Sequence, residues 1–172
     1  MKKIILVGYM GSGKSLIGKL LSEKTGIKFF DLDQIIEQRE NQTIKNIFDT
    51  KGEIYFRKLE HNVFLELLQS NDDIILSCGG GTPCYYNNHE LLNESNLYSI
   101  YLQGSIDTLY NRLILETNKR PLISGIKEPE LKEYIAKQLF ERSYFYNFSN
   151  FKINIDNKTP ESIVSEVQKL LT

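Results

Sequence analysis

The sequence predicts an α/β domain in which a mostly parallel sheet is covered by helices on both faces. Five short runs rich in β-forming residues alternate with longer segments in which apolar residues recur at helical spacing. Such alternation is typical of parallel strands connected through helices. The chain has 172 residues, of which 41% are apolar, and this suffices for one domain, residues 1–172, with its own core.

The expected strands lie far enough apart for a helix between each pair. They cover residues 3–7, 28–32, 74–77, 97–102 and 151–155. Gly26 closes the first helix, a short helix is expected at 34–40, and the last helix begins at Thr159 and Pro160 and runs to about residue 171. The apolar stripes that indicate core-facing helices are Ile17, Leu20 and Leu21; Phe56, Leu59, Val63 and Leu67; and Leu131, Ile135 and Leu139.

The composition excludes several classes of function. A formal net charge of -1 gives no overall attraction to nucleic acid or to an anionic membrane. No apolar stretch reaches the roughly 20 residues that a membrane span needs, and the N-terminus has the pattern of neither a signal nor a transit peptide. Neither the pair Cys78 and Cys84 nor the pair His61 and His89 has metal-site spacing. We therefore expect a reducing cytoplasm and thiols that only pack.

Residues 8–15, GYMGSGKS, match the phosphate-loop pattern GxxxxGK[ST] between an expected strand and an expected helix. The glycines let successive backbone N–H groups turn toward one anion, and the N-terminus of the helix adds its partial positive charge. Lys14 should reach the β- and γ-phosphates, and the Ser15 hydroxyl should ligate Mg²⁺. The sequence thus predicts a nucleoside triphosphate site; the alternative is a glycine-rich turn without a ligand.

Asp31 and Asp33 stand two residues apart at the end of the second expected strand. In extended backbone both carboxylates project from the same face, toward the edge where the phosphate loop lies. One can work with the magnesium and the other with an acceptor hydroxyl. The alternative is that Asp33 only caps the helix at 34–40.

Two arginines could bind an anionic acceptor. Arg57 has Glu53 four residues before it and Glu60 three after, so an exposed ion pair along the helix is its alternative explanation. Arg142 continues the inward stripe of its helix, and a guanidinium on a buried face usually has an anionic partner.

The segment 116–129 contains a proline, a glycine and several charges after a helical run, which suits a mobile loop better than core. Arg120 in this candidate lid could donate to the charge on a transferring phosphoryl group, or it could be solvated. Arg112, on the preceding helix, could lie near the nucleotide base or on the surface.

The run CGGGTP at 78–83 places three glycines directly after the third strand. A turn that requires positive φ explains one glycine, and two at most, because each costs about 1 kcal/mol in regular structure. Gly79, Gly80 and Gly81 together suggest that other groups approach the bare backbone closely.

These segments, in their order and spacing, resemble the shikimate kinase family along essentially the whole chain. The motifs that carry the resemblance are GYMGSGKS (8–15), DLD (31–33), IFDTKGEIYFRKLE (47–60), CGGGTP (78–83), KRPL (119–122) and the late Arg142. The resemblance implies a P-loop kinase of nucleoside monophosphate kinase type, with a five-stranded parallel sheet, an acceptor-binding helical region at about 33–61 and a mobile lid at about 112–126. It implies transfer of the γ-phosphoryl group of ATP to the 3-hydroxyl of shikimate, with Mg²⁺.

The resemblance also assigns roles, residue by residue. Lys14, Asp33 and Arg120 are implied to be catalytic, with Asp33 as the base, and Ser15 and Asp31 serve the metal. Shikimate is implied to contact Asp33, Arg57, Gly79, Gly80, Gly81 and Arg142, beside an apolar wall of Ile44, Phe48 and Phe56. ATP is implied to contact Gly11, Ser12, Gly13, Lys14, Ser15, Leu16, Arg112 and Arg120, with Asn157 and Lys158 as candidates at an adenine loop shorter than some family versions.

Two alternatives are open. One is another small-molecule P-loop kinase, such as a gluconate kinase, which the DLD, FR and GGGTP segments disfavour. The other is a ligand-sensing module without turnover, which the presence of Lys14, Asp33 and Arg120 disfavours. We expect a monomer that binds neither nucleic acid nor membrane.

Overall fold

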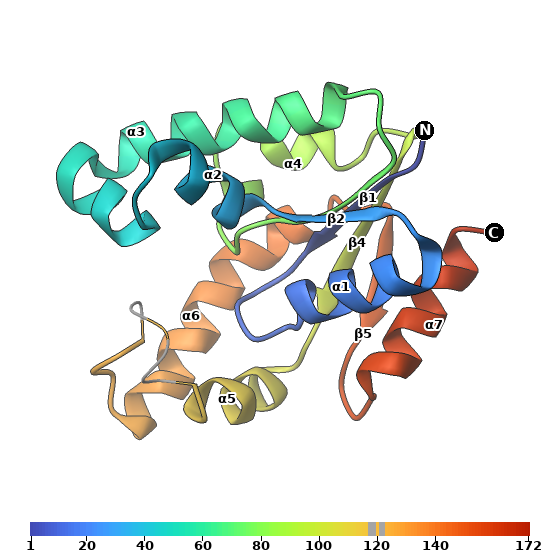
Figure 1. The fold of residues 1–172 in the computed structure, drawn as a ribbon. Helices are drawn as coiled ribbons and strands as arrows, with labels where there is room; N and C mark the ends of the chain where they lie inside the picture. Colours follow the sequence, from blue (N-terminus) through green and yellow to red (C-terminus); the bar gives the residue numbers. More distant parts are fainter. Residues whose placement is uncertain (117–119, 121–122) are drawn as a thin grey trace.

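The computed structural model describes residues 1–116, 120 and 123–172 (Figure 1). Pro121 and part of the predicted lid at 112–126 lie outside the described residues. None of the described helices is both long and apolar enough to cross a membrane.

Five parallel strands form one sheet in the order β2-β3-β1-β4-β5. The strands are β1 (Lys3–Val7), β2 (Lys28–Asp31), β3 (Ile74–Ser77), β4 (Leu97–Gln103) and β5 (Phe151–Asn154). This confirms the predicted α/β class and all five expected strands, with ends that differ by at most one residue. The chain winds to one side of β1 and then to the other, so β1 and β3 are neighbours at the point where binding sites of such sheets usually form.

The helices cover both faces of the sheet, as Figure 1 shows. They are α1 (Lys14–Thr25), α2 (Leu32–Glu40), α3 (Ile44–Gln69), the 3₁₀ turn η1 (Thr82–Cys84), α4 (Asn88–Leu91), α5 (Ile106–Ile114), α6 (Glu128–Tyr146) and α7 (Pro160–Leu170). Helix α2 begins at Leu32, two residues before the expected start, because the Asp31 carboxylate caps it. Gly52, with φ 85°, interrupts α3 with a kink.

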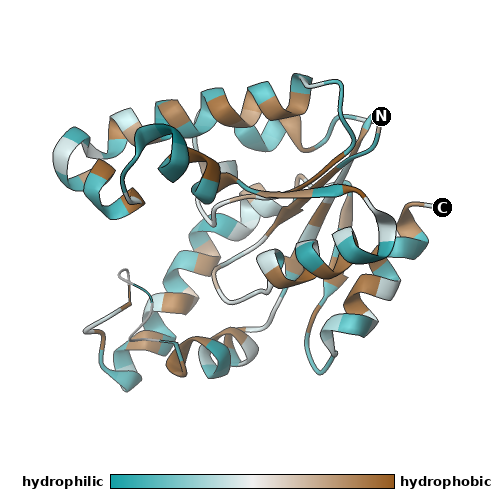
Figure 2. Cartoon of the chain, in the orientation of Figure 1, coloured by the Kyte–Doolittle hydropathy of each residue, from teal (hydrophilic) through white to brown (hydrophobic). Residues whose placement is uncertain are grey.

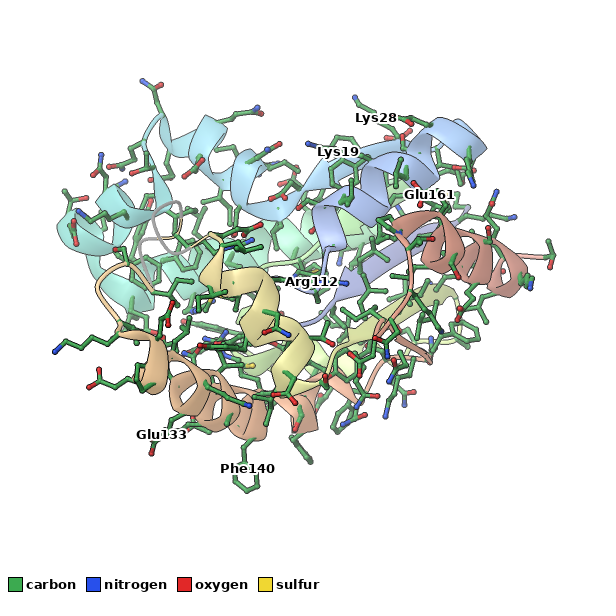
Figure 3. All side chains as sticks on the ribbon, turned by 90° about the horizontal axis from the view of Figure 1, so that it is seen from below. Lys19, Lys28, Arg112, Glu133, Phe140 and Glu161 are labelled. Carbon is green, nitrogen blue, oxygen red and sulfur yellow. The ribbon has the colours of Figure 1, made fainter. Side chains whose placement is uncertain are left out.

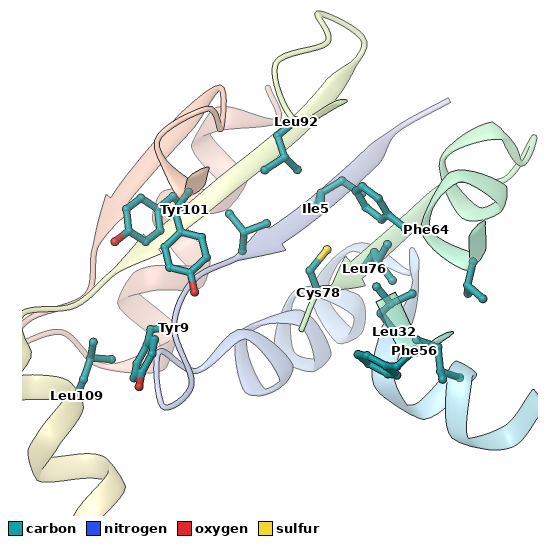
Figure 4. Packing of buried hydrophobic residues seen from close by; sticks show 14 of the residues in the cluster. Ile5, Tyr9, Leu32, Phe56, Phe64, Leu76, Cys78, Leu92, Tyr101 and Leu109 are labelled. Carbon is teal, nitrogen blue, oxygen red and sulfur yellow. The ribbon is translucent and has the colours of Figure 1, made fainter. Parts of the chain in front are cut away.

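Alternate residues of β1 point into two separate cores. Ile5 and Val7 pack with residues of α3, α5 and α6, whereas Ile4 and Leu6 pack with residues of α1 and α7. Figure 4 shows part of the first core, with Phe56, Phe64 and Leu76 around the sheet. Figure 2 shows that the strands are largely apolar while the helices alternate apolar and polar residues, as expected for a sheet buried on both faces.

We expect Leu21→Ala to lower the free energy of unfolding by about 2–5 kcal/mol, because the side chain is fully buried between α1 and the sheet. Lys19→Ala, on the exposed face of the same helix, should change it by no more than about 0.5 kcal/mol. Chemical denaturation measures both, and equal losses in the two variants would contradict this packing.

Candidate active site

Two glycine-rich loops leave the sheet side by side at the carboxyl ends of β1 and β3. The strands are in register, with Leu6 opposite Ser77, and the Cys78 N–H donates to the Leu6 carbonyl oxygen at 3.0 Å. In Figure 1 the α2–α3 region lies on one side of this edge and α5 with α6 on the other. Groups from distant parts of the sequence therefore meet here.

The phosphate loop has the backbone that its glycines predict. Gly8, Gly11 and Gly13 have φ of 149°, 81° and 92°, in the region that favours glycine. The Lys14 ammonium donates to the carbonyl oxygens of Gly8, at 2.8 Å, and Tyr9, at 3.1 Å. Burial lowers the pKa of Lys14 to about 8, against the opposing effect of Asp33.

Ser15 and Asp31 lie together beside this loop. The Ser15 hydroxyl donates to the Asp31 carboxylate at 2.8 Å, and the Ser77 hydroxyl is 3.4 Å from that of Ser15. Hydroxyl and carboxylate oxygens are the ligands that Mg²⁺ prefers in proteins, so the donor set fits this ion.

The structure corrects the expected backbone geometry of Asp33 and the alternative that it caps α2. The residue lies in the first turn of α2, so the two aspartates do not share an extended strand, and the cap of α2 is Asp31, which accepts from the N–H groups of Asp33 and Gln34. The Asp33 carboxylate is free for another role. Burial raises the pKa of Asp33 to about 6, and the carboxylates of Glu60 and Asp31 add to this rise while Lys14 and Arg57 oppose it.

Arg57 forms a buried ion pair, which corrects the expectation of an exposed one. One of its Nη atoms donates to Glu60 at 2.8 Å, and the side chains of Arg57 and Glu60 are only 12% and 1% exposed. The other neighbour, Glu53, is more distant, with 3.8 Å between Nε and the carboxylate. Glu60 also accepts from the Thr82 hydroxyl at 2.6 Å, and the Tyr85 ring lies under the guanidinium, 4.0 Å from its carbon. Arg57 is therefore fixed from several sides.

The predicted apolar wall lies next to Arg57. The rings of Phe48 and Phe56 pack with centroids 4.7 Å apart, and Ile44 and Phe48 are half-buried against the same core. The Phe56 ring also lies 5.1 Å from the guanidinium carbon of Arg57.

The glycine triplet, Gly79 to Gly81, brings the predicted acceptor residues together. None of the three has a positive φ, so the explanation by a left-handed turn is wrong. A Cβ on Gly79 would lie 3.2 Å from the Asp33 carboxylate, one on Gly80 3.2 Å from an Nη atom of Arg142, and one on Gly81 2.7 Å from an Nη atom of Arg57. Charged side chains therefore approach the backbone closely at all three glycines, as the sequence suggested, and most closely at Gly81.

The triplet also adjoins the phosphate loop. A Cβ on Gly80 would lie 3.7 Å from the backbone nitrogen of Met10. The predicted nucleotide loop and the predicted acceptor residues therefore adjoin at Gly80.

One face of α6 carries polar side chains into this region at intervals of four residues. Gln138 accepts from the Tyr9 hydroxyl at 2.6 Å, the Arg142 guanidinium lies 5.9 Å from the centre of the Tyr9 ring, and Tyr146 donates to the Gly80 carbonyl. Of these three residues, only Arg142 was predicted from the sequence. The four-residue spacing from Arg142 to Gln138 and Tyr146, like the three-residue spacing from Arg57 to Glu60, was a signal that could have found these partners.

Two arginines lie near the phosphate loop. Arg112 donates to the Gly11 carbonyl at 3.1 Å, and Figure 3 shows it between α5 and the start of α1. Arg120 pairs with Glu116 at 2.7 Å and is close enough to Lys14 to lower the pKa of that lysine. Leu16, at the start of α1, is half exposed.

The remaining sequence candidates lie outside this group. Lys158 pairs with Glu166 at 2.7 Å, and Asn157 has a φ of 56° in the turn before α7. Both cysteines are free thiols, and burial raises the pKa of each, that of Cys84 to about 11. A raised pKa disfavours the reactive thiolate, which agrees with a packing role.

Comparison with known proteins gives one consistent result. A family model described as shikimate kinase matches residues 10–172. Shikimate kinases of Flavobacterium johnsoniae and Flavobacterium psychrophilum are 55% and 49% identical to the chain over 171 residues, with 99% of each chain covered. Crystallised shikimate kinase from Bacteroides thetaiotaomicron superposes with a TM-score of 0.90 at 35% identity, covering 99% of this chain and 98% of that one.

Two other solved structures are also similar to the chain. Shikimate kinase from Acinetobacter baumannii, in complex with shikimate, has a TM-score of 0.85 at 28% identity and covers 99% of this chain and 93% of its own. A gluconokinase from Sinorhizobium meliloti has a TM-score of 0.61 at 19% identity, with 98% and 93% covered, and shares the fold alone.

We expect Gly81→Ala to lower the free energy of unfolding by about 1–3 kcal/mol, because the added methyl group would overlap the fixed guanidinium of Arg57. The same change in an Arg57→Ala background should cost less, since the obstructing group is gone. Thermal or chemical denaturation of the four proteins of this cycle gives the coupling. An equal cost in both backgrounds would show that Arg57 is not what excludes a side chain at position 81.

Proposed function

Because this chain belongs to the shikimate kinase family, we propose a role for each charged residue at the carboxyl edge of its sheet. The protein is an ATP-dependent kinase that transfers the γ-phosphoryl group to the 3-hydroxyl of shikimate, giving shikimate 3-phosphate and ADP for chorismate and aromatic amino acid synthesis. The observation that carries the residue assignments is the glycine triplet, whose backbone meets Asp33, Arg57 and Arg142 beside the phosphate loop.

The phosphate loop and the start of α1 hold the ATP phosphates. Backbone N–H groups of Gly11 and of residues 13–16 would donate to the phosphates, while the Ser12 N–H donates to the Tyr9 carbonyl within the loop, and the helix N-terminus adds its partial positive charge. Lys14, which now donates to two carbonyl oxygens of its own loop, turns to the β- and γ-phosphates.

Ser15 and Asp31 would hold magnesium, Asp31 through water. Their oxygens are already within 2.8 Å of each other, in a donor set that suits a hard cation. When bound, the ion would neutralise part of the charge of the ATP phosphates.

Asp33 orients the 3-hydroxyl of shikimate and accepts its proton late in the transfer. Its carboxylate does not cap α2, borders the glycine triplet and is close enough to Lys14 and Arg57 to be influenced by both. Phosphoryl transfer has a largely dissociative transition state, so positioning and charge neutralisation contribute more than proton abstraction.

Arg57 and Arg142, which approach neighbouring glycines of the triplet, bind the carboxylate of shikimate. Glu60 and the Tyr85 ring restrain Arg57, so little side-chain entropy remains to be lost on binding. The ring of the substrate would pack on Ile44, Phe48 and Phe56.

Arg120 and Arg112 act at the nucleotide. Arg120 leaves Glu116 and donates to the transferring phosphoryl group, a role supported by its influence on Lys14. Arg112, which contacts the Gly11 carbonyl, lies along the adenine.

All these residues come from one chain, and we propose that it acts as a monomer in the cytoplasm. An ADP-release assay with shikimate, gluconate and nucleoside monophosphates tests the activity. We expect turnover with shikimate only. Turnover with gluconate would favour the other small-molecule kinase, and tight shikimate binding without ADP release would favour a sensing module.

We expect Asp33→Asn to lower kcat by about 10²- to 10⁴-fold, the usual contribution of a general base, while ADP affinity stays within about twofold. Asp107→Asn is the matched control, because this exposed aspartate pairs only with Lys132 among the described groups and lies away from the site. Steady-state kinetics and a calorimetric titration with ADP measure both variants. Near-normal turnover in Asp33→Asn would remove the residue from the mechanism.

We expect Arg57→Ala and Arg142→Ala each to weaken shikimate binding by about 2–5 kcal/mol, because a desolvated carboxylate loses a charged donor. Arg39→Ala is the control, since Arg39 forms an exposed pair with Glu66. Calorimetric titration with shikimate measures the loss, and ADP titration checks that each variant is folded. Unchanged shikimate affinity in both site variants would refute the assignment.

A further inference from the structure

Tyr146, the last residue of α6, has no role in the mechanism described so far. Its side chain is fully buried, and its hydroxyl donates to the carbonyl oxygen of Gly80 at 2.5 Å. The guanidinium of Arg142, one helical turn earlier, lies beside this hydroxyl: a Cβ on Gly80 would be 3.2 Å from an Nη atom of Arg142 and 3.8 Å from the hydroxyl oxygen of Tyr146. A phenolic oxygen can donate one hydrogen bond and accept others, so both contacts can exist at once.

The bond to Gly80 differs from the other hydrogen bonds of the glycine triplet. The carbonyl oxygens of Gly79 and Gly81 accept from Thr82 and Cys84, three residues further along the same loop. The Gly80 carbonyl alone is tied to a distant element, 66 residues away in the sequence. Tyr146 is therefore the contact that fixes the middle of the triplet relative to the rest of the site.

Fixing this carbonyl also fixes a hydrogen-bond donor. The C=O of Gly80 and the N–H of Gly81 belong to one planar trans peptide group, so they point in opposite directions. Within the described part of the chain, the N–H groups of Gly80 and Gly81 donate to no protein acceptor. A peptide between two glycines rotates easily, because neither residue has a side chain to restrict it.

The tyrosine itself is rigid. Its ring packs against that of Tyr101, with centroids 5.1 Å apart, inside the core formed by β1, β4 and α6. A phenylalanine would fill nearly the same volume, so packing alone does not require the hydroxyl. The hydroxyl is explained by its two partners, both of which belong to the acceptor site.

We propose that Tyr146 is a positioning residue for shikimate: its hydroxyl holds the Gly80–Gly81 peptide and the Arg142 guanidinium in the mutual arrangement that receives the substrate. This inference rests on the proposed function, because Gly80 and Arg142 are acceptor contacts only in that function. Tyr146 acts through these two groups and does not touch the reacting atoms.

The experiment compares Tyr146→Phe with the wild-type protein by steady-state kinetics with shikimate and ATP varied in turn. We expect the KM for shikimate to rise about tenfold, the effect of one hydrogen bond to a positioned group, and the KM for ATP to stay within about twofold. Tyr101→Phe is the matched control: it removes the hydroxyl of the adjacent buried tyrosine, which has no hydrogen bond to the glycine triplet. Its KM values should equal those of the wild type.

A second measurement separates positioning from general loss of structure. In an Arg142→Ala background, Tyr146→Phe should raise the KM for shikimate less than threefold, because one of its two partners is already gone. An unchanged KM for shikimate in Tyr146→Phe would overturn the proposal. So would parallel increases in both KM values with a lowered Tm, or a full tenfold effect in the Arg142→Ala background. Failure of the proposed function is recognised separately, because the wild-type protein would then not release ADP with shikimate.

Discussion

Charged side chains of both signs are crowded at the carboxyl edge of the sheet. The site depends on their electrostatic pairing, in which each charge is held by neighbours of the opposite sign or by hydrogen bonds. Glu60 is buried and shared by Arg57 and Thr82, and it also raises the pKa of Asp33. A buried charge that loses its partner costs several kcal/mol, so the position of each group depends on the others. This pairing joins Arg57 to Glu60 and places Asp33 close to both negative and positive charges.

The charged groups can lie this close together because the loop between β3 and η1 has no side chains at three positions. Each glycine gives up stability that an ordinary residue would supply, and each meets a different charged group instead. The loop is not loose, because all three carbonyl oxygens accept hydrogen bonds, two within the loop and one from Tyr146. Bare backbone and fixed orientation together let two substrates approach each other.

Helix α6 connects the two halves of the site. Its apolar face packs through Leu131 and Ile135 into the core, and its polar positions reach the phosphate loop through Gln138 and the glycine triplet through Arg142 and Tyr146. The opposite face of the helix is solvated, with Phe140 and Glu133 pointing away from the protein in Figure 3. A rigid helix anchored in the core can thus hold both binding loops at a fixed separation.

The sequence alone determined the order of strands and helices, the phosphate loop and most of the charged residues of the site, because these depend on local patterns: apolar period, glycine spacing and residue type. It could not determine that the Asp31 carboxylate, rather than that of Asp33, caps α2, nor that Glu60 is buried, nor which side chain approaches each of the three glycines. Those outcomes depend on which groups meet across the sheet edge. Tyr146 is the clearest case: its spacing from Arg142 places both residues on one face of a helix, but the hydrogen bond to Gly80, 66 residues away, arises only from the packing of α6 on the sheet.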